Sequence, residues 1–159
     1  MGVKVAIGQD SHRFAAERAG KALILGGVRF CGQPPLEGNS DADVVLHALC
    51  NAISGLTGVN VLGAAADRMC LEDGIADSEA YVEEAMKHLG GWRLSHLSFS
   101  IECARPHIAP QLEAMRANIA RVAKLPAASV GVTATSGEGL TAFGQGLGIQ
   151  AICVATAAL

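Results

Sequence analysis

Aromatic residues are scarce in this sequence, at 4% of 159 residues, although 50% of the residues are hydrophobic. A core of this composition must be filled by small and aliphatic side chains, which favours close packing of helices on a sheet. No apolar run approaches the ~20 residues that a membrane-spanning helix needs, and the apolar run at the N-terminus is too short for a signal peptide. We therefore expect a cytoplasmic protein with no membrane partner.

A strong charge of either sign is also lacking. The formal net charge is −3 and the basic residues are scattered, so the sequence has no basic patch of the kind that binding to a nucleic-acid backbone requires. The cysteines are odd in number and widely spaced, which argues against a disulfide framework or a thiolate zinc site and predicts reduced core thiols. They are Cys31, Cys50, Cys70, Cys103 and Cys153.

The chain contains no repeat, low-complexity tract or long linker, so we expect a single domain over residues 1–159. Hydrophobic periodicity and turn signals predict an α/β (or α+β) fold with helices packed on one face of a sheet. Strands are expected at residues 3–7, 22–30, 94–103, 130–135 and 148–155. Helices are expected from an N-cap at Ser40 to about residue 55, at residues 77–88, and from residue 109 onward.

The first cluster of polar residues follows the first predicted strand. Asp10 and His12 are separated by one residue, and this alternation in an extended chain directs both side chains to the same side, within reach of one ion. Such a pair also occurs by chance, so an ordinary surface loop is the alternative interpretation.

The second cluster begins the first predicted helix. His47 lies one turn after Asp43 and one turn before Asn51, so the three share a helix face. The amide oxygen of Asn51 is expected to accept the proton of one ring nitrogen of His47 and leave the other nitrogen free for a metal. Together with Asp10 and His12, His47 would supply a donor set that suits Zn²⁺ with one position open, the arrangement of a catalytic site.

A third candidate is the loop that follows the strand predicted at residues 130–135. Its hydroxyls and glycines can bind phosphate oxygens, and Glu138 can hold a hard divalent cation. An ordinary polar turn is an equally good interpretation. The glycines at residues 144–148 do not form a dinucleotide fingerprint, because they lead into a strand rather than a helix.

Four stretches resemble the 2-C-methyl-D-erythritol 2,4-cyclodiphosphate synthase family, in order and over essentially the whole chain. They are Gly-Gln-Asp-Ser-His-Arg-Phe at residues 8–14, Leu-Gly-Gly-Val at 25–28, Asn-Ser-Asp-Ala-Asp-Val-Val-Leu-His-Ala-Leu at 39–49, and Thr-Ala-Thr-Ser-Gly-Glu-Gly-Leu at 133–140. The first and third stretches together are highly specific.

The resemblance implies a homotrimer around a threefold axis, with active sites between subunits. It also implies a metal-dependent phosphorus–oxygen lyase that cyclises 4-diphosphocytidyl-2-C-methyl-D-erythritol 2-phosphate and releases CMP, in non-mevalonate isoprenoid synthesis. By resemblance, the catalytic residues would be Asp10, His12 and His47, which hold Zn²⁺ or another divalent transition metal, and Glu138, near which Mg²⁺ or Mn²⁺ would bridge two phosphates.

The resemblance also implies a binding site for the nucleotide diphosphate substrate. The methylerythritol end would lie near Asn39, Ser40 and Gly63. The cytidine end would be held by Cys103, Pro106, His107, Ile108, Ala109, Ala134, Thr135 and Ser136.

The sequence departs from the family pattern mainly at the substrate end. Asn39 replaces a usual His and Val61 a usual Asp, while Asn60 and Asp67 are the nearby polar residues available for hydroxyl binding. The other departures are Asn51 for Asp, His107 for Lys, Ala142 for Phe and Gln145 for Arg. Two alternatives are therefore a zinc enzyme for a related diphosphate, and an inactive or repurposed trimeric binder of isoprenoid or nucleotide diphosphates.

Overall fold

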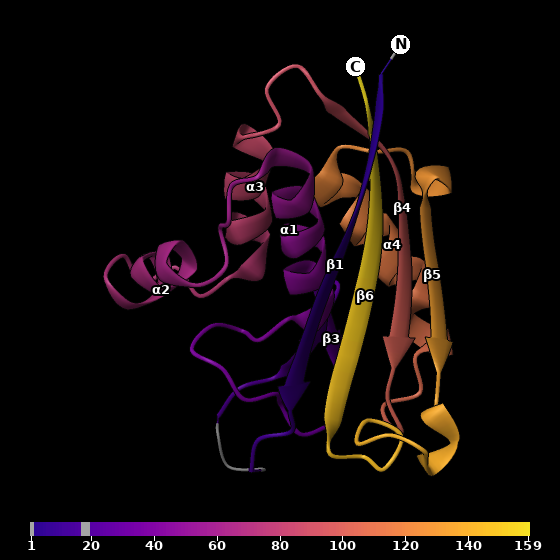
Figure 1. Cartoon of the computed structure of the whole chain (residues 1–159). Helices are drawn as coiled ribbons and strands as arrows, with labels where there is room; N and C mark the ends of the chain where they lie inside the picture. The colour runs from indigo at the N-terminus through magenta and orange to yellow at the C-terminus, as the bar shows by residue number, and fades with distance from the viewer. Residues whose placement is uncertain (1, 17–19) are drawn as a thin grey trace.

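Four long strands form the main sheet of the protein, in the order β1-β6-β4-β5 (Figure 1). In this computed structural model, which describes residues 2–16 and 20–159, β6 is antiparallel to both β1 and β4, and β5 is parallel to β4. The strands are β1 (Val3–Arg13), β4 (Arg93–Glu102), β5 (Val130–Thr135) and β6 (Gly148–Ala158). In a single chain, β1 and β5 are therefore the two edges of this sheet.

The sequence predicted one strand at residues 22–30. The extended conformation is confirmed, but the structure divides the segment into the two strands of a hairpin. The two strands, β2 (Leu23–Leu25) and β3 (Val28–Phe30), pair with each other in a separate small sheet. Gly26 and Gly27 form the turn between them with positive φ angles of 59° and 76°, a conformation that favours glycine. The hydrophobic pattern of this segment does not reveal that turn.

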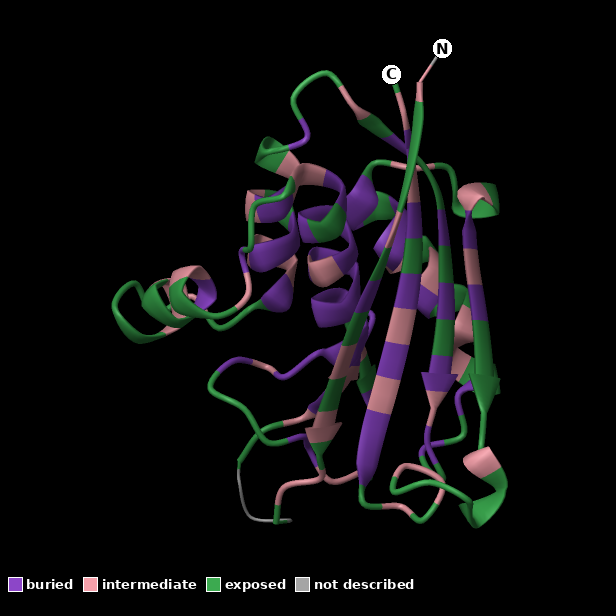
Figure 2. Cartoon of the chain, viewed as in Figure 1, coloured by how far each residue is buried: buried purple, intermediate pink, exposed green. Residues whose placement is uncertain are grey.

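The helices α1 and α4 cover one face of the main sheet, and α3 packs against these two helices (Figure 1). Buried residues are gathered where these elements meet (Figure 2). This mixed α/β arrangement confirms the predicted fold class. Their bounds are α1 (Val44–Thr57), α3 (Ser78–Lys87) and α4 (Leu112–Ala123), and the 3₁₀ turns are η1 (Ala109–Gln111), η2 (Ala127–Ser129) and η3 (Gly137–Gly139).

A further helix, α2 (Ala64–Leu71), projects beside this layer and is absent from the sequence prediction (Figure 1). Its N-cap is Gly63, which makes no side-chain capping bond, and Ala66 is its only buried residue. The helix therefore lacks both a capping residue and an apolar stripe, the two sequence signals on which helix prediction depends.

The first residue of α1 is fixed by Asp43, not by the Ser40 cap that the sequence suggested. The buried carboxylate of Asp43 accepts hydrogen bonds from the backbone N–H groups of Val45 and Leu46 in the first turn. It also accepts hydrogen bonds from the backbone N–H groups of Gly26 and Gly27, with nitrogen–oxygen distances of 2.9 and 2.6 Å. Burial raises the pKa of Asp43 to about 6, and these backbone donors oppose the shift. One side chain thus ties α1 to the β2–β3 hairpin.

Helix α1 approaches β1 most closely at Gly8. A Cβ placed on Gly8 would lie 2.1 Å from the carbonyl oxygen of Ala48 and 2.2 Å from the nitrogen of Ala52. Backbone atoms cannot yield as a flexible side chain can, so Gly8→Ala should lower the free energy of unfolding by ~3 kcal/mol. Chemical denaturation measures this change. Gly131→Ala is the matched control, because its Cβ would meet only one atom, at 3.9 Å; an equal loss in both variants would contradict the argument.

The opposite face of the sheet carries exposed apolar side chains. Val3, Val5 and Ile7 are 63%, 64% and 67% exposed, and Ile7 pairs directly with Val154 of β6, which is also exposed. Directly paired residues share a face, so the apolar residues continue from β1 to β6. A continuous exposed apolar patch of this kind is typical of an association surface.

The described cysteines are free, and three of them are buried, as predicted: Cys50, Cys103 and Cys153. Burial raises the pKa of the Cys50 thiol to about 12 and that of Cys103 to about 11. The prediction is wrong for Cys31, which is exposed, and for Cys70, which is half-buried. In the described part of the chain, no helix combines the length and apolar character that crossing a membrane requires.

Candidate metal centre and a second pocket

Asp10 and His12 lie on β1 itself, because the strand extends to Arg13 rather than ending at residue 7. The prediction that these residues follow the strand in a loop is therefore wrong. The prediction that an extended chain directs both side chains to the same side is confirmed. Asp10 and His12 share the face on which Gly8 meets α1, and His47 approaches them from the first turn of that helix. The close contact at Gly8 therefore brings the three side chains together.

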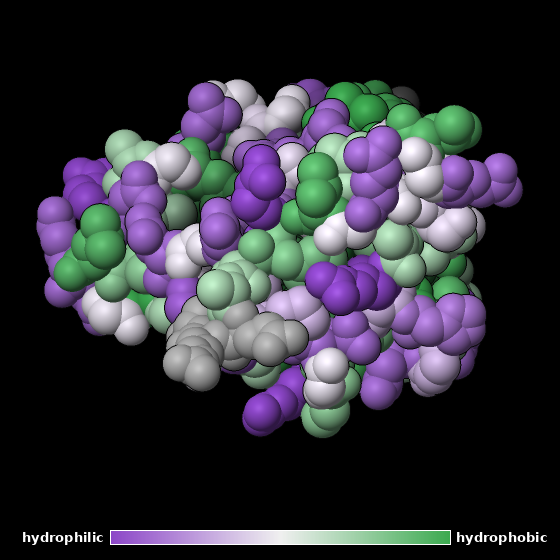
Figure 3. Space-filling model, turned by 90° about the horizontal axis from the view of Figure 1, so that it is seen from below, coloured by the Kyte–Doolittle hydropathy of each residue, from purple (hydrophilic) through white to green (hydrophobic). Residues whose placement is uncertain are grey.

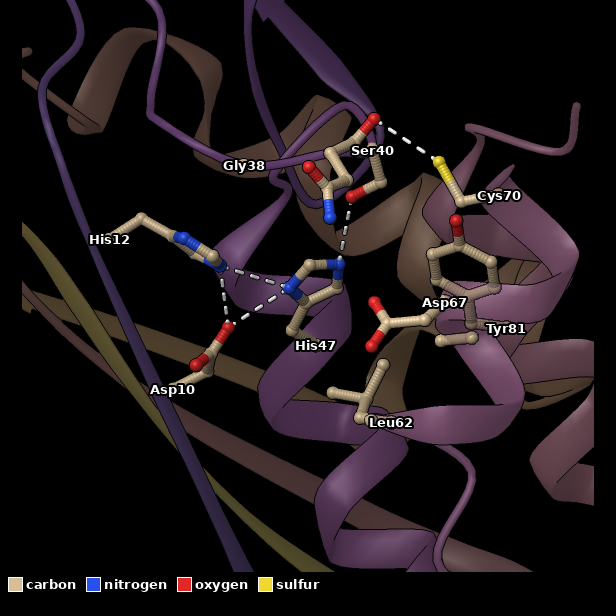
Figure 4. Close-up of a pocket in the computed structure, with 12 residues that line it drawn as sticks. Asp10, His12, Gly38, Ser40, His47, Leu62, Asp67, Cys70 and Tyr81 are labelled. Carbon is tan, nitrogen blue, oxygen red and sulfur yellow. Dashed lines mark hydrogen bonds and ion pairs between the residues drawn. The ribbon is translucent and has the colours of Figure 1, made fainter. Parts of the chain in front are cut away.

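The three side chains form a compact cluster (Figure 4). Oδ2 of Asp10 lies 2.9 Å from Nε2 of His12 and 2.9 Å from Nδ1 of His47. The same two ring nitrogens are 3.2 Å apart. One donor atom from each residue lies within 4.8 Å of the others, so the cluster converges on one point at the end of a pocket.

The electrostatics of the cluster favour an ionised carboxylate. Burial opposes ionisation of Asp10, but hydrogen bonds and the charges of His12 and His47 outweigh it, so the pKa of this carboxyl lies well below its usual range. The hydrogen bond to Asp10 raises the pKa of His12, against the effect of burial. Asp10 is therefore an anionic oxygen donor between two imidazoles.

Asn51 does not bind the second ring nitrogen of His47, so the prediction that its amide oxygen accepts a proton from His47 is wrong. The side-chain nitrogen of Asn51 instead donates to the backbone oxygen of Gln9, at 3.0 Å. Nε2 of His47 lies 2.8 Å from the hydroxyl of Ser78 and 3.5 Å from that of Ser40. Ser78 comes from α3, so helix register within α1 gave no signal of this contact.

Two imidazole nitrogens and one carboxylate oxygen form a donor set that can hold a divalent transition metal. Because these are three protein donors beside an open pocket, the set is of the catalytic rather than the structural type.

The pocket at this cluster has a volume of about 300 Å³ and places Asn39, Ser40 and Gly63 close to the metal ligands. Val61 is buried at 2% exposure and does not reach it. Asp67, one of the two polar residues suggested for hydroxyl binding, lines the pocket wall formed by α2 and points toward His47 (Figure 4). The full lining is Asp10, His12, Gly38, Asn39, Ser40, His47, Leu62, Gly63, Ala66, Asp67, Cys70 and Tyr81.

A second pocket, of about 310 Å³, lies at the ends of β4 and β5. It brings together all eight residues assigned by resemblance to the cytidine end, together with Ala104. The lining is Cys103, Ala104, Pro106, His107, Ile108, Ala109, Ala134, Thr135 and Ser136. The two pockets share no residue. The first adjoins the edge strand β1, and the second lies at the ends of β4 and of the other edge strand, β5.

Glu138 follows the second pocket in the η3 turn, away from the metal cluster along the sheet. It is exposed and has a positive φ of 49°. Its backbone N–H donates to the hydroxyl of Ser136, at 3.3 Å. A non-glycine residue in this conformation is uncommon and often marks a functional position. Seen from the end of the sheet where this loop lies, hydrophilic and hydrophobic side chains are intermingled on the surface (Figure 3).

The fold and the site together define an α/β protein with a carboxylate–imidazole cluster that could hold a metal ion at one sheet edge. The sequence pattern of the YgbB family matches residues 3–158. The chain therefore belongs to the YgbB family.

The relatives of the chain agree with this assignment. It is 51% identical over 154 residues to 2-C-methyl-D-erythritol 2,4-cyclodiphosphate synthase of Chlamydia trachomatis, a match that covers 96% of this chain and 86% of that protein. The solved bifunctional IspDF of Campylobacter jejuni superimposes with a TM-score of 0.88 at 25% identity over 98% of this chain, which spans 42% of that longer chain. IspF of Plasmodium falciparum in complex with CDP shares the fold, with a TM-score of 0.81 at 19% identity over 98% of this chain and 96% of that chain.

Proposed function

We propose that the protein is a 2-C-methyl-D-erythritol 2,4-cyclodiphosphate synthase that converts 4-diphosphocytidyl-2-C-methyl-D-erythritol 2-phosphate into the 2,4-cyclodiphosphate and CMP. The observation that carries the proposal is the convergence of Asp10, His12 and His47 in an open pocket, in a chain that is 51% identical to a synthase of this name. It acts in non-mevalonate isoprenoid synthesis, and a cytoplasmic location stays a prediction from the sequence.

The reaction requires positioning and charge neutralisation more than proton transfer. The 2-phosphate of the substrate attacks the β-phosphorus, and the bond from that phosphorus to the oxygen of the leaving CMP breaks. The nucleophile is already an anion and the leaving group is a phosphate, so neither needs an acid or base of high strength. Asp10, His12 and His47 would hold a Zn²⁺ ion, which would supply Lewis-acid stabilisation of phosphate oxygens. The pocket residues Asn39 and Ser40 orient the phosphate-bearing end beside these ligands.

The second pocket binds the cytidine end of the substrate. Backbone groups in the segments around Pro106 and Ala134 contact the base, and the hydroxyls of Thr135 and Ser136 are available to phosphate oxygens. Glu138 follows in the next turn, and its carboxylate would hold Mg²⁺ or Mn²⁺, hard cations that would neutralise phosphate charge. CDP in the Plasmodium falciparum complex is a ligand of the same chemical class.

A homotrimer joins the two pockets into one active site. In one chain, Asp10 and His12 of the metal centre are on β1, and the cytidine pocket is at the ends of β4 and β5. β5, the outer strand of that pocket, is three strand spacings from β1, or ~14 Å. If the β5 edge of one subunit faces the β1 edge of the next, the pockets adjoin. Three such contacts close a ring, and the ring covers the exposed apolar face at Val5 and Ile7.

Incubation of the purified protein with the diphosphocytidyl substrate, Zn²⁺ and Mg²⁺ tests the activity, with CMP release measured and phosphorus NMR used to identify the cyclic diphosphate. Formation of both products in equal amounts is the expected result. Absence of both from a zinc-loaded sample would exclude the synthase. Binding of CMP without turnover would instead identify the repurposed diphosphate binder.

The hydroxyl groups of the methylerythritol bind Asp67. Val61 is buried and apolar, and Asn60 is exposed and does not line the pocket. The carboxylate of Asp67, in contrast, points into the pocket and has no hydrogen bond or ion pair to another described side chain. A carboxylate accepts hydrogen bonds from two adjacent hydroxyls.

Asp67→Asn should raise KM for the diphosphocytidyl substrate by about tenfold, the value of one charge-assisted hydrogen bond, while zinc content stays at the wild-type level. Steady-state kinetics and metal analysis of the same preparation measure both quantities. Asn60→Ala is the matched control and should leave KM unchanged. Equal KM values in wild type and Asp67→Asn would contradict the assignment of Asp67.

A further inference from the structure

Ser78, the first residue of α3, joins the candidate metal centre to a second carboxylate. Ser78 is completely buried. Its hydroxyl lies 2.8 Å from Nε2 of His47 and donates a hydrogen bond to Oδ1 of Asp41. Oδ2 of Asp41 also accepts the backbone N–H of Ser78, at 3.1 Å. The carboxylate thus fixes both the position of Ser78 and the direction of its hydroxyl.

The protons available in the hydrogen bonds that run from Asp41 through Ser78 to His47 determine which ring nitrogen of His47 is protonated. A carboxylate only accepts hydrogen bonds, and a serine hydroxyl has one proton to donate. Because the Ser78 proton is committed to Asp41, the Ser78 oxygen can only accept from His47. Nε2 must then carry a proton, and in the neutral ring Nδ1 presents its lone pair toward Asp10 and His12. The Ser40 hydroxyl, at 3.5 Å, is too distant to be the main partner.

We propose that Ser78 and Asp41 are positioning residues for the metal centre, which select the tautomer of His47 that leaves Nδ1 free for the metal. A ring that can neither rotate nor exchange tautomers loses less entropy when it binds a metal, and its basicity is raised by the hydrogen bond at the far nitrogen. The inference rests on the proposed metal centre and assigns two residues that touch neither metal nor substrate.

The position of these residues gives α3 a function beyond packing. Asp41 precedes α1, and its backbone N–H donates to the carbonyl oxygen of Ala76, just before α3. The loop before α1 and the first turn of α3 are therefore held together by Asp41, and the metal ligand on α1 is oriented through that junction. Displacement of α3 would disturb His47 without any change in Asp10 or His12.

Ser78→Ala should weaken zinc binding by about 10- to 100-fold, the range for loss of such a hydrogen bond to a ligand histidine. Competition with a chromophoric chelator measures the Kd of the protein for Zn²⁺ in the absence of substrate. The visible absorption spectrum of the Co²⁺-loaded protein should also change, because the ligand field depends on the orientation of His47. Ser78→Thr keeps the hydroxyl and should restore the wild-type Kd and spectrum.

Asp77→Ala separates this role from a general effect on α3. The side chain of Asp77 caps α3 by accepting a hydrogen bond from the N–H of Glu79 and makes no hydrogen bond to His47. Its loss should lower Tm and leave the zinc Kd unchanged. Wild-type zinc affinity in Ser78→Ala, or an equal loss in Asp77→Ala, would overturn the positioning role. Failure of the wild-type protein to bind zinc would instead overturn the metal centre itself.

Discussion

His47→Ala should abolish zinc binding and lower turnover of the diphosphocytidyl substrate by roughly 10³-fold or more. His47 supplies one of three converging donor atoms, and the remaining pair, Asp10 and His12, both come from one edge strand. Asp10→Asn should have the same result, because an amide oxygen has no formal charge to offset that of the cation. Metal analysis after dialysis and a CMP-release assay measure the two effects.

The comparison needs a histidine variant that leaves the site intact. His88 caps the C-terminal end of α3 and its side chain is exposed, so His88→Ala should keep wild-type zinc content and turnover. Circular dichroism should show that His47→Ala remains folded. Full zinc occupancy in a folded His47→Ala or Asp10→Asn protein would show that the metal is held elsewhere.

Mixed trimers of two inactive variants should regain about one third of the wild-type turnover. His47→Ala destroys the metal centre at the β1 edge, and Glu138→Gln removes the carboxylate at the β5 edge. If each active site combines the β1 edge of one subunit with the β5 edge of its neighbour, every trimer that contains both variants has one intact site of three. Co-expression with two different affinity tags and tandem purification isolates these trimers.

The control for this experiment pairs two variants of the same pocket. Mixed trimers of His47→Ala and Asp10→Asn contain a defect in the metal centre of every subunit, so they should show no recovery. If mixed trimers of His47→Ala and Glu138→Gln are equally inactive, the two pockets do not come from neighbouring subunits. High turnover of Glu138→Gln alone would contradict the role assigned to Glu138.

Local sequence patterns predicted most of the helices and strands. The apolar stripe of α1 is buried, β5 has the predicted bounds, and α3 begins and ends within a residue of the predicted range. These elements carry strong periodicity or caps, which depend only on neighbours along the chain. α2 and the Gly26-Gly27 turn were missed because their conformations depend on local φ angles and packing that produce no periodic pattern.

The three residues that converge in the candidate metal centre could be proposed from the sequence because their chemical types and their order are explicit in it. Asp10 and His12 share a face through strand alternation alone, and the resemblance of the surrounding motifs joined His47 to them. What the sequence could not provide was the partner of His47. Asn51 shares its helix face, but Ser78 of α3 is the residue in contact, because that partner is determined by how α3 packs against α1.

The sequence by itself therefore determined the chemical groups of the candidate site and the α/β class. Only the tertiary structure decided that Val61 is buried while Asp67 reaches the pocket, and that the two pockets lie at opposite sheet edges. The physical reason is the range of the interactions. Side-chain chemistry and alternation act within a few residues, whereas contacts such as Gly8 on α1 and Ser78 on His47 join segments that are distant in the chain.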